Sequence, residues 1–171
     1  QRIYLAGASY GAITGSTVLA FEKRIRAGVL IYGGANIPLM LDAPMIRDGA
    51  QKEGYGWLLP PARVLAGWFL GVSDPKRYAA KVLPTPVYVQ AGSHDSLVWP
   101  EASKALIHAI GNPTKVQWYD SDHIGMDKDS GFSNTKAVLK DALTWLLEQD
   151  DTFRTEDQKI KVFPDFEIEN S

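Results

Sequence analysis

Ser9, Asp95 and His123 supply a hydroxyl, a carboxylate and an imidazole, in the chain order serine, aspartate, histidine. A serine hydroxyl is a weak nucleophile until a base removes its proton, and an acid must hold that base in the right tautomer. These three residue types can therefore form an acyl-enzyme and hydrolyse it, provided that the fold brings them together. Their positions along the chain predict that it does.

Ser9 lies in the pattern G-x-S-x-G, from Gly7 to Gly11. Chance alone places this pattern in roughly one chain in twenty of this length, and the alternative is a strand-to-helix turn that merely needs small residues. The context favours a nucleophile turn, because an apolar strand pattern over Arg2–Ala6 precedes it and a helix pattern over Ala12–Phe21 follows it. We expect glycine on both sides of Ser9 because a side chain there would strike the strand or the helix.

The chain has three histidines that could serve as the base. His108 lies inside a helical pattern, where a solvated or core histidine is the simpler interpretation. His94 stands beside Asp95 in the turn after the third predicted strand, which makes it the rival base. His123 follows the last predicted strand in a polar loop, and it is the base that we predict.

Continuous apolar runs alternate with helix patterns, which predicts a largely parallel sheet with helices on both faces. The predicted strands are Arg2–Ala6, Ala27–Tyr32, Pro86–Gln90 and Lys115–Tyr119, and the predicted helices are Ala12–Phe21, Pro100–Ile110 and about Asn134–Glu148. Ser9, Asp95 and His123 each come just after a strand. Because the carboxyl ends of parallel strands share one edge of a sheet, the three side chains should meet there.

The pattern of the sheet is interrupted between residues 35 and 84, where the chain is divided into short pieces by Pro38, Pro44, Pro60, Pro61 and Pro75. We interpret residues 1–149 as one catalytic domain with a lid-like helical insertion at about 35–84, and residues 150–171 as a charged tail. The tail is expected to be loosely ordered, with an edge strand or a contact with a neighbouring chain as alternatives. Trp57, Trp68 and Phe69 in the insertion could line an apolar substrate pocket, or could simply pack the insertion on the core.

Composition excludes several classes of protein. The 171 residues carry a formal net charge of −2, so a nucleic-acid partner is not expected. The sequence has no cysteine, so disulfides and a cysteine nucleophile are not expected either. No apolar run is long enough for a membrane-spanning helix. Five residues between 120 and 129 could suggest a metal site, but they lack the spacing of a calcium loop; they are Asp120, Asp122, His123, Asp127 and Asp129. We expect a solvated acidic loop there, and neither a metal nor a cofactor.

From Arg2 to about Glu148 the sequence resembles the C-terminal half of an α/β-hydrolase, of the esterase/lipase or dienelactone-hydrolase-like kind. The resemblance is carried by the serine turn, by a G-x-x-D turn from Gly92 to Asp95, by His123 after the last strand and by Asp74-Pro75-Lys76-Arg77-Tyr78. It implies a carboxylesterase or lipase-like serine hydrolase that needs no cofactor. In it Ser9 would be the nucleophile, Asp95 the acid, His123 the base and the Tyr10 backbone N–H an oxyanion-hole donor.

The resemblance leaves two functional alternatives open. The expected substrate is a small-molecule ester with an apolar acyl or alcohol group. Amides, peptides and thioesters are the alternative substrates, because the same three groups cleave them. A non-catalytic subunit that keeps the fold for binding is the other alternative, since a fold does not fix a function.

The same resemblance predicts a missing part. In this family roughly four strands precede the nucleophile turn, and the loop after the third carries a second oxyanion donor. A sheet that stopped at Arg2–Ala6 would expose a long apolar edge. We therefore expect the N-terminal strands to be supplied by a preceding segment, by a second polypeptide after cleavage or by a partner chain.

Overall fold

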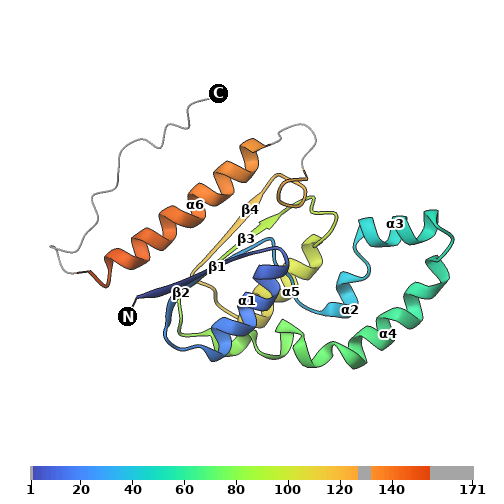
Figure 1. Cartoon of the computed structure of the whole chain (residues 1–171), viewed down its shortest axis with the longest axis horizontal. Helices are drawn as coiled ribbons and strands as arrows, with labels where there is room; N and C mark the ends of the chain where they lie inside the picture. Colours follow the sequence, from blue (N-terminus) through green and yellow to red (C-terminus); the bar gives the residue numbers. More distant parts are fainter. Residues whose placement is uncertain (1, 127–131, 155–171) are drawn as a thin grey trace.

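The computed structural model describes residues 2–126 and 132–154, and its centre is a parallel sheet of four strands (Figure 1). The strands are β1 (Ile3–Ala8), β2 (Ile25–Ile31), β3 (Val87–Gly92) and β4 (Lys115–Tyr119), in the spatial order β1-β2-β3-β4. Each neighbouring pair is parallel. The predicted α/β class and its four strands are confirmed, with ends shifted by at most two residues.

Helices cover both faces of this sheet. One face carries α1 (Tyr10–Phe21) and α5 (Pro100–Ile110), and the opposite face carries α6 (Phe132–Asp151). Successive side chains of a strand point to opposite faces. Leu30 accordingly packs in the core cluster of α1 and α5, whereas Val29 packs in the cluster of α6. Burial on both faces explains why the central strands read as continuous apolar runs.

The segment between β2 and β3 consists of short helices, as predicted. They are α2 (Ile37–Met40), α3 (Pro44–Lys52), η1 (Gly56–Leu58), α4 (Leu59–Phe69), η2 (Gly71–Ser73), η3 (Pro75–Arg77) and η4 (Ala79–Val82). In Figure 1, α3 and α4 extend to one side of the sheet. The buried Asp74 carboxylate accepts hydrogen bonds from the backbone N–H groups of Asn36 at 2.9 Å, Ile37 at 2.7 Å and Lys76 at 2.9 Å. One side chain thus ties the two ends of this segment together.

The last helix is longer than predicted. α6 continues through Asp150 to Asp151, and the Tyr4 hydroxyl in β1 donates a hydrogen bond to Asp150 Oδ1 at 2.6 Å. The first residues of the predicted tail are therefore part of a packed helix. The remainder of that tail, residues 155–171, lies outside the described residues. Among the residues that the structure does describe, no helix is long and apolar enough to cross a membrane.

The two glycines that flank Ser9 play different structural roles. A Cβ added at Gly7 would lie 2.2 Å from the Gly11 carbonyl oxygen, so β1 and the start of α1 meet too closely for a side chain there. A Cβ at Gly11 would meet no atom within 4 Å. The expectation of a steric requirement is confirmed at Gly7 and is wrong at Gly11, because position 11 faces away from the strand.

This difference gives a test of the tight turn. We expect Gly7→Ala to lower the free energy of unfolding by about 1–3 kcal/mol, because the Cβ can be accommodated only by moving backbone. Gly11→Ala is the matched control, and it should be neutral or stabilising by up to about 1 kcal/mol, since alanine favours a helix over glycine. Urea unfolding of both variants measures the effect, and equal stabilities would contradict the close approach.

Candidate active site

Ser9 forms the turn between β1 and α1 in a strained backbone conformation, with φ 54° and ψ −119°. A non-glycine residue adopts a positive φ only where the surrounding structure holds it. Here the Ser9 N–H donates to the Ile31 carbonyl at 2.8 Å, and the Ser9 carbonyl accepts from the Ala12 N–H at 2.9 Å. The end of β2 and the first turn of α1 together hold the serine at the carboxyl edge of the sheet.

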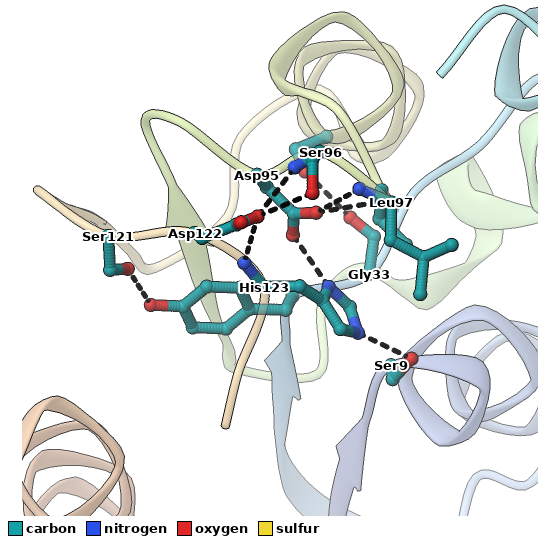
Figure 2. A network of polar contacts seen from close by, with 11 residues as sticks. Ser9, Gly33, Asp95, Ser96, Leu97, Ser121, Asp122 and His123 are labelled. Atoms are coloured by element: carbon teal, nitrogen blue, oxygen red, sulfur yellow. Dashed lines mark hydrogen bonds and ion pairs between the residues drawn. The ribbon is translucent and has the colours of Figure 1, made fainter. Parts of the chain in front are cut away.

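His123 connects Ser9 to Asp95 (Figure 2). Its Nε2 lies 2.8 Å from Ser9 Oγ, and its Nδ1 lies 2.7 Å from Asp95 Oδ2. An ionised carboxylate only accepts hydrogen bonds, so it selects the tautomer with the proton on Nδ1. Nε2 then accepts the hydrogen bond that the serine hydroxyl donates. The predicted nucleophile, base and acid are thus brought together in that order.

Asp95 is held at both carboxylate oxygens. While Oδ2 faces His123, Oδ1 accepts from the backbone N–H groups of Leu97 at 2.9 Å and Val98 at 2.7 Å. The side chains of Asp95 and His123 are 0% and 5% exposed. Because the loop after β3 folds back on its own carboxylate, the orientation of Asp95 toward the imidazole is fixed before any substrate binds.

Sequence reasoning missed the residues that surround the imidazole. The buried Tyr32 ring meets the His123 ring edge-on at a centroid distance of 5.9 Å, and its hydroxyl lies 2.5 Å from Ser121 Oγ. A Cβ at Gly92 would come within 2.7 Å of the Tyr32 ring and 2.8 Å of the Ser121 carbonyl oxygen. Gly92 therefore lets the histidine-bearing loop pack closely on the end of β3. Tyr32 has a positive φ of 53° at the end of β2. The two glycines that follow it, Gly33 and Gly34, are the signal in the sequence for a turn at this position.

The other two histidines lie elsewhere. The His94 side chain is 73% exposed, and its Nε2 pairs with Asp120 Oδ1 at 2.8 Å. His108 is exposed on α5, in agreement with the solvated interpretation. All three histidines are among the described residues, and His123 is the one that contacts Ser9.

Tyr10 is the first residue of α1. A backbone N–H in the first turn of a helix has no acceptor within the helix, and the helix dipole favours negative charge there. The position next to Ser9 therefore suits an N–H that stabilises a developing oxyanion. The three aromatic residues of the insertion are exposed by 72% at Trp57, 77% at Trp68 and 65% at Phe69. In the described chain these side chains therefore do not pack on the core.

Only three of the five residues considered for a metal site lie in the part of the chain that the structure describes, and they are Asp120, Asp122 and His123. No group of three or more metal-ligating side chains gathers there. Asp127 and Asp129 of the considered cluster lie outside the described residues, and Asp120 pairs with His94. Asp122 accepts hydrogen bonds from the backbone N–H groups of Ser96 and His123.

No protein-family model and no curated protein matches the chain, but solved structures do. The α/β hydrolase GrgF of Penicillium sp. sh18 matches with a TM-score of 0.58 and 16% identity, over 86% of this chain and 63% of that one. An esterase of Pyrococcus furiosus matches with a TM-score of 0.63 and 19% identity, over 86% of this chain and 54% of that one.

An acylaminoacyl peptidase of Pyrococcus horikoshii matches with a TM-score of 0.58 and 16% identity, over 96% of this chain and 25% of that one. The chain thus spans less than two thirds of the length of the structures it resembles. Together with the parallel sheet and the strained serine turn, these matches identify the chain as having the α/β-hydrolase fold.

Proposed function

We propose that the chain carries the catalytic residues of a serine hydrolase that cleaves carboxylic esters. The observation that supports this most strongly is the continuous hydrogen-bonded series from Ser9 Oγ through His123 to Asp95, at 2.8 Å and 2.7 Å. A binding role does not require all three groups in this arrangement, whereas acyl transfer by a serine with a histidine base uses each of them.

The reaction proceeds through an acyl-enzyme. His123 Nε2 accepts the hydroxyl proton as Ser9 Oγ attacks the carbonyl carbon, and the oxyanion is stabilised by the Tyr10 backbone N–H and a second donor. When the intermediate collapses, the C–O bond to the alcohol breaks and His123 gives its proton to the leaving oxygen. Water then attacks the acyl group with His123 as base, and the collapse of the second intermediate returns the proton to Ser9. Asp95 orients the imidazole and stabilises its charged form throughout.

An ester with an apolar acyl or alcohol group is the substrate that we favour. The exposed side chains of Trp57, Trp68 and Phe69 support this, because they form apolar surface on the helical segment between β2 and β3, which we propose acts as a lid. The names of the similar structures include an esterase and a peptidase. An amide, peptide or thioester substrate is therefore the second candidate, since the same three groups cleave it.

We also propose that further strands complete the sheet beyond β1. In the described chain β1 pairs only with β2. The outer side of α1 bears a mostly apolar groove of about 510 Å³, and it is lined by Thr14, Thr17, Val18, Phe21, Glu22 and Ser73. An unpaired strand edge suits a covering strand, and an open apolar groove on the adjoining helix suits a packed segment. A preceding segment, a second polypeptide or a partner chain would supply them, together with the second oxyanion donor.

Labelling with a fluorophosphonate probe tests the proposal. We expect intact mass spectrometry to find one adduct on the purified wild-type protein, and peptide mapping to place it on Ser9, because only a serine activated by a base reacts. Ser9→Ala should abolish the adduct. Protein unfolded in urea is the control, since it keeps every serine but loses the base. A folded sample without any adduct would favour the non-catalytic binding subunit.

A further inference from the structure

We propose that Asp122 is a positioning residue, whose carboxylate fastens the loop that bears His123 to the loop that bears Asp95. The inference rests on the proposed function, because it concerns the geometry of the base in that reaction. Figure 2 places the Asp122 side chain between Ser96 and the backbone of His123. The hydrogen bonds that its carboxylate accepts come from Ser96 and from the His123 backbone, so its effect on the imidazole would pass through these groups.

A single oxygen of Asp122 receives hydrogen bonds from both loops. Oδ1 accepts from the Ser96 N–H at 2.8 Å, from the Ser96 hydroxyl at 2.8 Å and from the His123 N–H at 2.7 Å. Ser96 directly follows Asp95, the partner of the imidazole. The bond lengths to Oδ1 therefore fix how far the backbone of Asp95 lies from the backbone of His123.

The charge on Asp122 strengthens this connection. Its half-buried position alone would raise the pKa of Asp122, but the donors from Ser96 and His123 more than offset this and hold the pKa below its ordinary value. The side chain is thus a carboxylate at neutral pH, and hydrogen bonds to a carboxylate are stronger than those to a neutral oxygen.

The geometry of the base makes small displacements costly. The imidazole must keep Nδ1 at 2.7 Å from Asp95 and Nε2 at 2.8 Å from Ser9 at the same time. A shift of the His123 backbone moves both nitrogens together, so it cannot be corrected by a change of side-chain rotamer alone. A misplacement of about 1 Å can lower a rate on the order of a hundredfold.

Other contacts hold the two loops together without Asp122. The Ser93 N–H donates to the Tyr119 carbonyl at 2.8 Å, and the His94 N–H donates to the Ser121 carbonyl at 3.0 Å. Removal of the Asp122 carboxylate should therefore leave the fold intact while loosening the position of His123. The exposed pair of His94 and Asp120 joins the same two loops at the surface, where such a pair contributes little. Asp120 is consequently a matched control for Asp122.

Steady-state kinetics on four variants of the purified protein test the inference. We expect Asp122→Ala to lower kcat about 10- to 100-fold with little change in KM. Asp122→Asn keeps an acceptor oxygen and should recover most of that loss. Ser96→Ala removes one donor of three and should lower kcat by a smaller factor, and it also covers the case in which Asp122→Ala does not fold. Asp120→Ala should stay within about twofold of the wild type, as expected for an exposed pair.

Proton NMR of the wild type and Asp122→Ala gives a readout that needs no turnover. We expect the far-downfield resonance of the His123 Nδ1 proton to shift or broaden in the variant, while urea unfolding remains cooperative. An unchanged resonance together with kcat within twofold would overturn the inference. So would a loss of kcat that Asp122→Asn fails to recover and that follows stability in all variants. Full activity in Ser9→Ala would instead overturn the proposed function, whatever Asp122 does.

Discussion

Replacing His123 with alanine is expected to lower kcat for ester hydrolysis on the order of 10⁴- to 10⁶-fold, because Ser9 then has no group that accepts its proton. His94→Ala should stay within about twofold of the wild type, since an exposed histidine paired at the surface contributes little. Turnover of a chromogenic ester by both variants, at equal concentrations of folded protein, measures the difference. KM should change little in His123→Ala, because the ring acts on the reacting atoms and not on the bound ester.

His108→Ala is a control for the effect of losing any histidine. His108 is exposed in the last turn of α5 and belongs to neither of the loops that bear Asp95 and His123. If His94→Ala lost activity and His123→Ala kept it, the assignment of the base would be wrong. If all three variants kept the activity of the wild type, the reaction would not depend on any single one of these imidazoles.

Asp95→Asn has the second largest expected effect, a loss of kcat of about 10⁴-fold. The amide oxygen of asparagine can still accept from the N–H groups of Leu97 and Val98, so the loop keeps its shape. The amide nitrogen then faces Nδ1 of His123 as a donor, which forces the ring proton onto Nε2. A protonated Nε2 cannot accept the proton of Ser9, and the nucleophile is not activated. Single-turnover measurement of the acylation step would report the loss directly.

Asp74→Asn is the matched control for that substitution. Asp74 is a second buried carboxylate that accepts from backbone N–H groups, but it lies at the base of the helical segment and faces no histidine. Both variants remove a negative charge that accepts backbone hydrogen bonds, and both should lose stability. Only Asp95→Asn should lose the acylation step. A comparable fall of kcat in both would mean that the loss reflects general destabilisation.

The fold could be predicted because its central strands are buried on both faces. Residues such as Val29 and Leu30 are apolar in succession, which is how a covered parallel strand reads in a sequence. The position of the serine was equally accessible, because Gly7 is required by the close approach of Gly11 and leaves a recognisable pattern. The ends of elements were less accessible, as the extension of α6 to Asp151 illustrates.

The surroundings of the imidazole could not be predicted, because they depend on contacts between loops far apart in the chain. Nothing local to Tyr32 indicates that its hydroxyl meets Ser121, and nothing local to Asp122 indicates that it meets Ser96. Spacing alone also could not tell whether an aromatic residue such as Trp68 is core or surface. In this helical segment, apolar and polar residues do not alternate as they do in a strand. An apolar face of α4 could therefore lie either in the core or at the surface.

The carboxylate of Asp74 has a consequence for how this protein could diversify. Since it joins Asn36 and Ile37 to Lys76, the chain leaves the sheet and returns to it at one fastened neck. The segment beyond this neck also contacts the loop after β3, where the Met45 N–H donates to the Ser96 carbonyl. Residues between 38 and 73 form a cassette, by which we mean an insertion between β2 and β3. We expect its length and composition to be changeable without loss of the pairing between these strands. Under the proposed function, we expect variation in this cassette to alter the choice of acyl or alcohol group and to spare Ser9, Asp95 and His123. Under that function, the neck lies between the segment that we expect to select the substrate and the residues that we expect to react with it.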